Sequence, residues 1–173
     1  MNDEEAIRQC QVGNKDGFRH LVDRYQDVLY GTAYLMTGNQ TAAEDHVQEA
    51  FVSAWKSIGS FQVGRPVKPW LVRILVNKVI SQRRNHRPAT SPIEVAEETI
   101  QAAQSVAEEV ENRDEVGRAL AGLSGEHRRI VQLRYFTDLS VPEISIVLGC
   151  REGTVKSRLH RALEQMRQAI TKD

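Results

Sequence analysis

The sequence predicts an all-α protein made of two small helical domains joined by a flexible linker. Apolar residues recur at three- and four-residue intervals along most of the chain, and no stretch alternates as a β-strand would. A segment rich in Pro, Ala, Gln and acidic residues interrupts the helical pattern near the middle. At 173 residues, the chain is long enough for one ordinary domain or two small ones.

Residues 1–87 contain the first predicted domain. Its apolar periodicity predicts helices over residues 17–36, 41–58 and 70–84. Gly38 is expected to stop the first of these helices, and the Thr41-Ala-Ala-Glu44 sequence has the form of a capping box that opens the second. Between the second and third helices, the glycines and prolines of residues 59–69 predict a loop.

Residues 88–110 are the predicted linker, and residues 111–173 form the second domain, in which we expect four short helices. Fully extended, a linker of this length reaches ~80 Å at ~3.3 Å per residue. The two domains could therefore act at well-separated positions.

The balanced charge of the whole chain conceals alternating blocks of charge. Residues 65–92 carry seven basic and no acidic side chains, whereas residues 93–115 carry one basic and eight acidic ones. Residues 116–173 are basic again, with ten basic and six acidic side chains. Two basic blocks are compatible with a polyanionic partner, and an ordinary solvated surface remains the alternative.

A helix-turn-helix is the sharpest local pattern. Ser140-Val-Pro-Glu143 has the form of a capping box, Gly149 permits a tight turn, and a longer helix follows from about Glu152. An apolar stripe is expected to face inward in that longer helix, at Val155, Leu159, Leu163, Met166 and Ile170. The polar residues at its tip and on its opposite face are the candidate DNA-binding set: Arg151, Glu152, Thr154, Lys156, Ser157, His160 and Arg161.

Two polar surfaces are expected in the first domain. On the helix over residues 41–58, an acidic outward face comprises Asp45, Gln48, Glu49 and Val52; it suits a protein contact, and an ordinary solvated face is the alternative. The basic block offers a nucleic-acid surface on the next helix and the loop before it, made of Arg65, Lys68, Trp70, Arg73, Asn77, Ser81 and Arg84. Trp70 could equally fold into the core.

Three stretches together resemble the extracytoplasmic-function (group 4) sigma factors of the sigma-70 family. Residues 43–55 (AEDHVQEAFVSAW) are similar to the polymerase-clamp helix of sigma region 2. Residues 69–77 (PWLVRILVN), with the two arginines that follow, are similar to the helix that recognises the −10 promoter element. Residues 123–135 (LSGEHRRIVQLRY), 139–144 (LSVPEI) and 153–161 (GTVKSRLHR) resemble sigma region 4.

The resemblance implies an alternative sigma factor that binds core RNA polymerase and directs it to promoter DNA. The acidic face would bind core polymerase, the basic surface of the first domain would recognise and help melt the −10 element, and the helix-turn-helix would read the −35 element. The resemblance also implies an anti-sigma partner, which is often membrane-anchored in that family. Two departures fall in the −10 region: Ser81 stands where an acidic residue is common, and residues 64–69 are less Ser/Thr-rich than usual.

The rival interpretation is a helix-turn-helix regulator that does not act with core polymerase. No receiver pattern, catalytic constellation or phosphate-binding loop is found, so we expect no catalytic residues, enzymatic activity or small-molecule substrate. Cys10 and Cys150 lie far apart and outside any Cys/His cluster, so no metal or other cofactor is expected. These cysteines and the acidic N-terminal segment, which has no apolar signal core, predict a cytoplasmic location.

Overall fold

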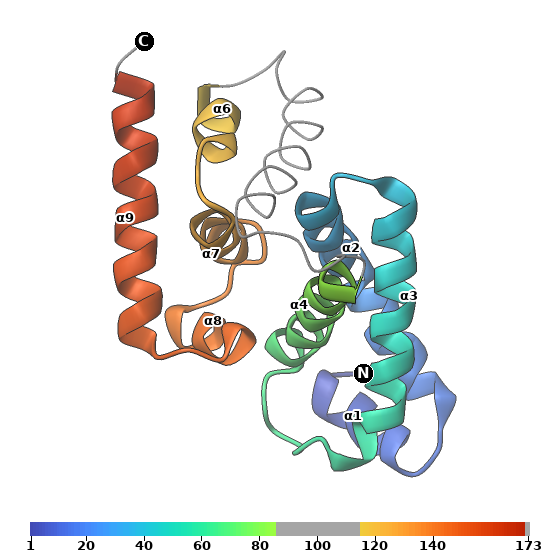
Figure 1. Cartoon of the computed structure of the whole chain (residues 1–173). Helices are drawn as coiled ribbons and strands as arrows, with labels where there is room; N and C mark the ends of the chain where they lie inside the picture. The colour runs from blue at the N-terminus through green and yellow to red at the C-terminus, as the bar shows by residue number, and fades with distance from the viewer. Residues whose placement is uncertain (86–114, 172–173) are drawn as a thin grey trace.

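The computed structural model describes residues 1–85 and 115–171, and every regular element within those ranges is a helix (Figure 1). The N-terminal unit comprises α1 (Asp3–Gln11), α2 (Lys15–Thr37), α3 (Gln40–Ser57), the short 3₁₀ helix η1 (Ile58–Ser60) and α4 (Val67–Asn85). The C-terminal unit comprises α6 (Glu115–Ala121), α7 (Gly125–Tyr135), α8 (Val141–Leu148) and α9 (Glu152–Thr171). The predicted linker, residues 88–110, lies outside the described residues.

The N-terminal unit is a bundle in which α2 packs against α1, α3 and α4. Its helices have strong local ends. Asn14 caps α2 by accepting a hydrogen bond from the Asp16 amide, and Gly38 ends it in the left-handed conformation that the sequence predicts. The buried side chains at the centre of the bundle include Leu21, Leu29, Phe51, Leu71 and Leu75.

Two predicted boundaries in this unit are wrong. The Thr41–Glu44 capping box does not form: Asn39 is the N-cap of α3, its side chain accepts from the Ala42 amide at 2.9 Å, and Thr41 lies inside the helix. Asn is a stronger N-cap than Thr, and the turn at Gly38 leaves Asn39 extended. Helix α4 begins at Val67, before Trp70, because Pro69 occupies the first turn, where its missing N–H costs nothing.

The predicted helix-turn-helix forms. Ser140 and Glu143 make the complete capping box of α8, and Gly149 adopts the left-handed conformation at its end. Of the predicted apolar stripe on α9, Val155 and Met166 are buried.

Leu163 does not belong to that stripe, because its side chain is 37% exposed and Ala162 is fully buried instead. At ~100° per residue, Ala162 lies within about 20° of Val155 around the helix, whereas Leu163 lies about 80° away. The geometric centre of the stripe therefore runs through Ala162. Helix α9 spans 20 residues from Glu152, which confirms the longer helix predicted there and corrects the expectation that all four helices of this unit are short.

The two units are in contact, chiefly through α8 against α4 and through α7 against α2 (Figure 1). One hydrophobic cluster runs through both, joining the core of the N-terminal bundle to Ile130, Leu133, Leu139, Ile144, Val147 and Val155. A second, smaller cluster holds α6, α7 and α9 together. Figure 1 shows α9 at the outer edge of the molecule, on the side of the C-terminal unit that faces away from the bundle.

A glycine in α2 shapes this contact between the units. The ring of Phe136, from the end of α7, lies where a side chain at Gly31 would be: a Cβ there would fall 2.4 Å from the Phe136 Cζ atom. The side-chain amide of Gln132 also donates a hydrogen bond to the Leu35 carbonyl at 3.4 Å. A glycine inside a helix costs about 1 kcal/mol relative to Ala. Gly31 carries this cost at the position where Phe136 of the C-terminal unit approaches α2.

The corrected stripe on α9 predicts unequal effects of two truncations. We expect Met166→Ala to lower the free energy of unfolding by about 2 kcal/mol, because it removes a buried side chain. We expect Leu163→Ala to change it by less than about 0.5 kcal/mol, because Leu163 is largely exposed. Urea denaturation of the two variants measures both values, and equal losses would contradict the assignment of the inward face.

Candidate nucleic-acid and polymerase interface

The acidic face predicted on α3 is exposed as a continuous strip. Asp45, Gln48 and Glu49 are exposed, and Val52 is 53% exposed between them and Lys56. The opposite side of the helix is fixed in the core by Val47, Ala50, Phe51 and Ala54. An exposed Val ringed by acidic and amide groups can contact another protein. The negative charge of Asp45 and Glu49 excludes phosphate binding by this strip.

The basic surface of the N-terminal unit is split between a stripe on α4 and the loop before it. Arg73, Asn77 and Ser81 are exposed and follow one another at four-residue intervals, so they form one row along the helix. Arg84 lies in α4 three residues after Ser81, and its side chain is outside the part of the structure that is described. The buried residues Leu71, Val72, Leu75, Val76 and Val79 hold the rest of α4 in the core.

The loop side of this surface contains Arg65, Lys68 and Trp70. Arg65 is exposed, and its Nε donates to the Gln62 side chain at 2.8 Å. Lys68 is partly exposed in the first turn of α4. Trp70 is also partly buried, with its ring centroid 4.5 Å from that of Phe61. Trp70 is therefore both a packing residue and a surface residue.

The polar set on α9 is exposed with a single exception. Arg151, Glu152, Lys156, Ser157, His160 and Arg161 are exposed, and Thr154 is partly buried. Val155 is fully buried and orients the first turns of the helix. Within residues 1–85 and 115–171, Arg151, Lys156 and Arg161 make no ion pair with a carboxylate, so their charges are available to an outside anion. Arg158 differs, because it pairs with Glu126 of α7 at 3.4 Å.

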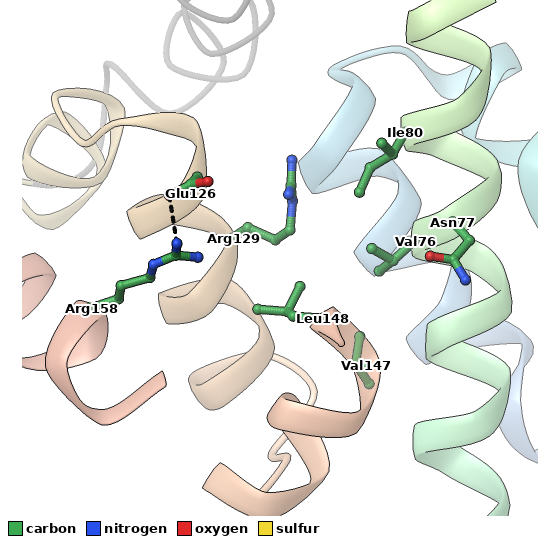
Figure 2. A pocket seen from close by; sticks show the side chains of 8 residues that line it. All are labelled: Val76, Asn77, Ile80, Glu126, Arg129, Val147, Leu148 and Arg158. Carbon is green, nitrogen blue, oxygen red and sulfur yellow. Dashed lines mark ion pairs between the residues drawn. The ribbon is translucent and has the colours of Figure 1, made fainter. Parts of the chain in front are cut away.

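A pocket of about 140 Å³ lies where the two units meet (Figure 2). Figure 2 shows Val76, Asn77 and Ile80 of α4 on one side, and residues of α7, α8 and α9 on the other, with the Glu126–Arg158 ion pair at its edge. Asn77 is thus exposed and at the same time faces the C-terminal unit. Among the described residues, no group of His, Cys, Asp and Glu is arranged to hold a metal ion.

Sequence reasoning missed the residues that join the two units. The signals were present in retrospect: Gly31 interrupts a helical pattern, which often marks a close approach, and α4 is apolar over more than half its circumference. Nothing in the sequence specified that these two features face Phe136 and α8. The helix-turn-helix and the exposed strips, by contrast, follow from local spacing.

Taken together, these features define a class: an all-helical protein that presents a helix-turn-helix beside a helical bundle with acidic and basic exposed faces. The comparisons narrow the class. Residues 21–88 match the family described as sigma-70 region 2, and residues 113–166 match sigma-70, region 4. The chain belongs to the extracytoplasmic-function (ECF) RNA polymerase sigma factors, a family of transcription initiation factors.

Relatives of similar length support this assignment. The chain is 33% identical to the ECF RNA polymerase sigma factor SigW of Bacillus subtilis, over 96% of each chain. It is 37% identical to SigL of Mycobacterium tuberculosis, over 88% of each chain. Among solved structures, CnrH in complex with the cytosolic domain of CnrY aligns with a TM-score of 0.74 and 27% identity, covering 99% of this chain and 98% of that one. These matches do not favour the rival regulator.

Exposure of the α9 face predicts a measurable electrostatic effect. We expect Lys156→Ala to weaken duplex DNA binding broadly across sequences and to reduce the slope of log affinity against log salt by about one, because one phosphate contact is lost. Arg167→Ala, which removes an equal charge at the far end of α9, is the control and should leave the slope unchanged. Fluorescence anisotropy across salt concentrations measures the slope, and identical slopes for wild type and Lys156→Ala would contradict a phosphate contact.

Proposed function

We propose that this sigma factor divides promoter recognition between its two units. The C-terminal unit reads the −35 element with the polar set on α9, and the N-terminal unit recognises and helps open the −10 element with the α4 stripe and the loop before it. The observation that carries the proposal is the pairing of two separate exposed basic surfaces with a third, acidic one. A helix-turn-helix alone would support only DNA binding.

The acidic strip on α3 is the proposed contact with core polymerase. Asp45, Gln48 and Glu49 supply charge and hydrogen-bond acceptors, and Val52 supplies an apolar centre. An apolar centre with a polar rim is a common arrangement of protein interfaces. This strip cannot serve the DNA, because its charge has the same sign as the phosphates.

The α4 stripe suits a strand that has been opened. Arg73 can neutralise phosphate, and Asn77 and Ser81 can hydrogen-bond base edges. Trp70 is partly exposed and can stack against an unpaired base. Extruding a base costs a few kcal/mol, which stacking and hydrogen bonds recover.

Binding of both elements by one chain requires the two units to separate. As their names imply, the −35 and −10 elements lie about 25 base pairs apart, which is roughly 80 Å along B-form DNA. Helices α4 and α9 are each about 30 Å long and belong to units packed against each other. The packed arrangement therefore cannot span the promoter. Separation would also move the C-terminal unit away from Asn77, which lines the pocket between the units.

The remaining assignments follow from the family. CnrH was solved with the cytosolic domain of CnrY, and the aligned sigma factor RpoE of Bartonella quintana with the anti-sigma factor NepR, so an anti-sigma factor is the proposed regulatory partner of this chain. The chain supplies no covalent chemistry of its own, because the polymerase carries the reaction. Among the described residues, no helix is long and apolar enough to cross a membrane. A cytoplasmic site of action is proposed, since that is where RNA polymerase works.

Transcription with purified core polymerase tests the proposal. The template is a promoter enriched from a random DNA library by the wild-type chain with core enzyme, and the expected result is transcription that depends on both. In the same assay, Asn77→Ala should reduce opening of the −10 region about tenfold, measured by permanganate reactivity, while binding to −35 duplex changes little. A chain that binds DNA but never directs core polymerase would refute the sigma assignment. Equal losses of opening and −35 binding would refute the division of labour.

A further inference from the structure

The loop that leads into α4 is tied to α1 by a single side chain. The Gln11 amide donates both of its N–H groups, one to the Ile58 carbonyl at 3.1 Å and one to the Phe61 carbonyl at 2.8 Å. These carbonyls lie 47 and 50 residues further along the chain. Among the side chains that the structure describes, Gln11 alone hydrogen-bonds the backbone of residues 58–66 from another element. Figure 1 shows α1 at the end of the bundle where this loop lies.

Helix α1 is a firm support for such a tie. It approaches α2 so closely that a Cβ on Gly17 would fall 2.4 Å from the Ala6 carbonyl oxygen. Near the start of α1, Asp3 accepts a hydrogen bond from the Tyr25 hydroxyl and pairs with Arg24 at 3.4 Å. Burial raises the pKa of Tyr25, so its hydroxyl remains protonated and continues to donate.

The carbonyl groups that Gln11 holds belong to residues that shape the proposed −10 surface. Phe61 packs its ring against Trp70, the aromatic residue in the first turns of α4. Ile58 is buried, and its carbonyl also accepts from the Phe61 amide at 3.1 Å, so Gln11 completes a tight turn. The exposed residues that follow, including Gln62 and Arg65, begin from this fixed point.

The tie is outside the hydrophobic core. Gln11 is exposed, and its bonds to the loop are at most partly buried. The core of the bundle is complete without it, because α1 contributes Ala6, Ile7 and Cys10 to that core. A loss of these two hydrogen bonds would therefore release the loop while leaving the helices folded.

We propose that Gln11 is a positioning residue for promoter opening: it holds the loop before α4, and through Phe61 it holds Trp70, in the arrangement that captures the opened −10 strand. This inference rests on the proposed function of that surface. It assigns a role to α1, which lies outside the matched sigma-70 region 2 of residues 21–88. Gln11 acts through the loop and does not itself touch DNA.

Two variants of Gln11, each with a matched control at Val12, distinguish the effect of the two Gln11 hydrogen bonds from the effect of an added charge. Gln11→Glu keeps the shape of the side chain but replaces the donors with acceptors that repel the two carbonyls. Val12→Glu adds the same charge at the neighbouring residue, which is 83% exposed. Gln11→Lys restores N–H donors of a different shape, and Val12→Lys is its charge control.

The test uses the whole chain with core polymerase on the promoter enriched by the wild type, with permanganate reactivity at the −10 region as the readout. We expect Gln11→Glu to reduce opening about tenfold relative to Val12→Glu, and Gln11→Lys to recover most of that loss relative to Val12→Lys. Core binding, binding to −35 duplex and the melting temperature should stay at the values of the matched controls. Hydrogen exchange at residues 58–61 of the free protein should be faster in Gln11→Glu alone.

Opening by Gln11→Glu equal to that of Val12→Glu, with wild-type transcription intact, would overturn the role of Gln11 and leave the proposed function standing. Loss of core binding or of thermal stability in step with opening would also overturn it, because Gln11 would then be a general structural residue. A wild-type chain that never directs core polymerase would overturn the proposed function, and with it this role.

Discussion

The apolar contact between α4 and α8 is the constraint on which the rest of the arrangement depends. Helix α4 is buried on its bundle side, and Val76 and Ile80 also face Val147 and Leu148 of the C-terminal unit. On the exposed side of α4, Arg73, Asn77 and Ser81 form one row at four-residue intervals, and Gln82 is exposed beside it. The same helix thus provides the proposed −10 surface and the attachment of the other unit, so the two roles are physically linked.

Because of this linkage, the packing of the two units against each other bears on the proposed promoter recognition. Hydrophobic burial is worth about 25 cal/mol per Å² of apolar surface, so separation of the units carries a real cost. In the proposed function, contacts with core polymerase and promoter DNA supply the free energy for this separation. Gly31 and Phe136 add shape to the contact: any larger side chain at position 31 would meet the aromatic ring. The interface is therefore specific as well as apolar.

Much of the fold could be predicted because its signals are local. The Ser140 capping box, the left-handed Gly149 and the apolar spacing of α9 each depend on residues within a few turns of one another. Helix boundaries are harder to predict where two local signals compete. Asn39, and not Thr41, is the N-cap of α3. The prediction that Leu163 faces inward on α9 is wrong. Three- and four-residue spacings both fit a helix, and only the packing of the partner helices selects Ala162 for the buried position.

The long-range contacts could not be predicted from the sequence. Gln11 finds its two carbonyls about fifty residues away, and Phe136 meets Gly31 across a gap of about a hundred residues, so no spacing rule connects them. The exposed site residues lie between the predictable local features and the unpredictable long-range contacts. Their exposure followed from periodicity, but the position of Asn77 opposite the C-terminal unit did not.

The most direct test of this account is the distance between the two units before and after promoter binding. Dyes attached to cysteines introduced at Gln26 on α2 and Gln168 on α9, both exposed, report it by single-molecule energy transfer. Cys150 is replaced by Ser, whereas burial raises the pKa of the Cys10 thiol and keeps it poorly reactive. The account predicts one short distance in the free protein, and a distance longer by tens of ångströms in the open complex with core polymerase. An unchanged short distance in the open complex, or a free protein that is already extended, would contradict it.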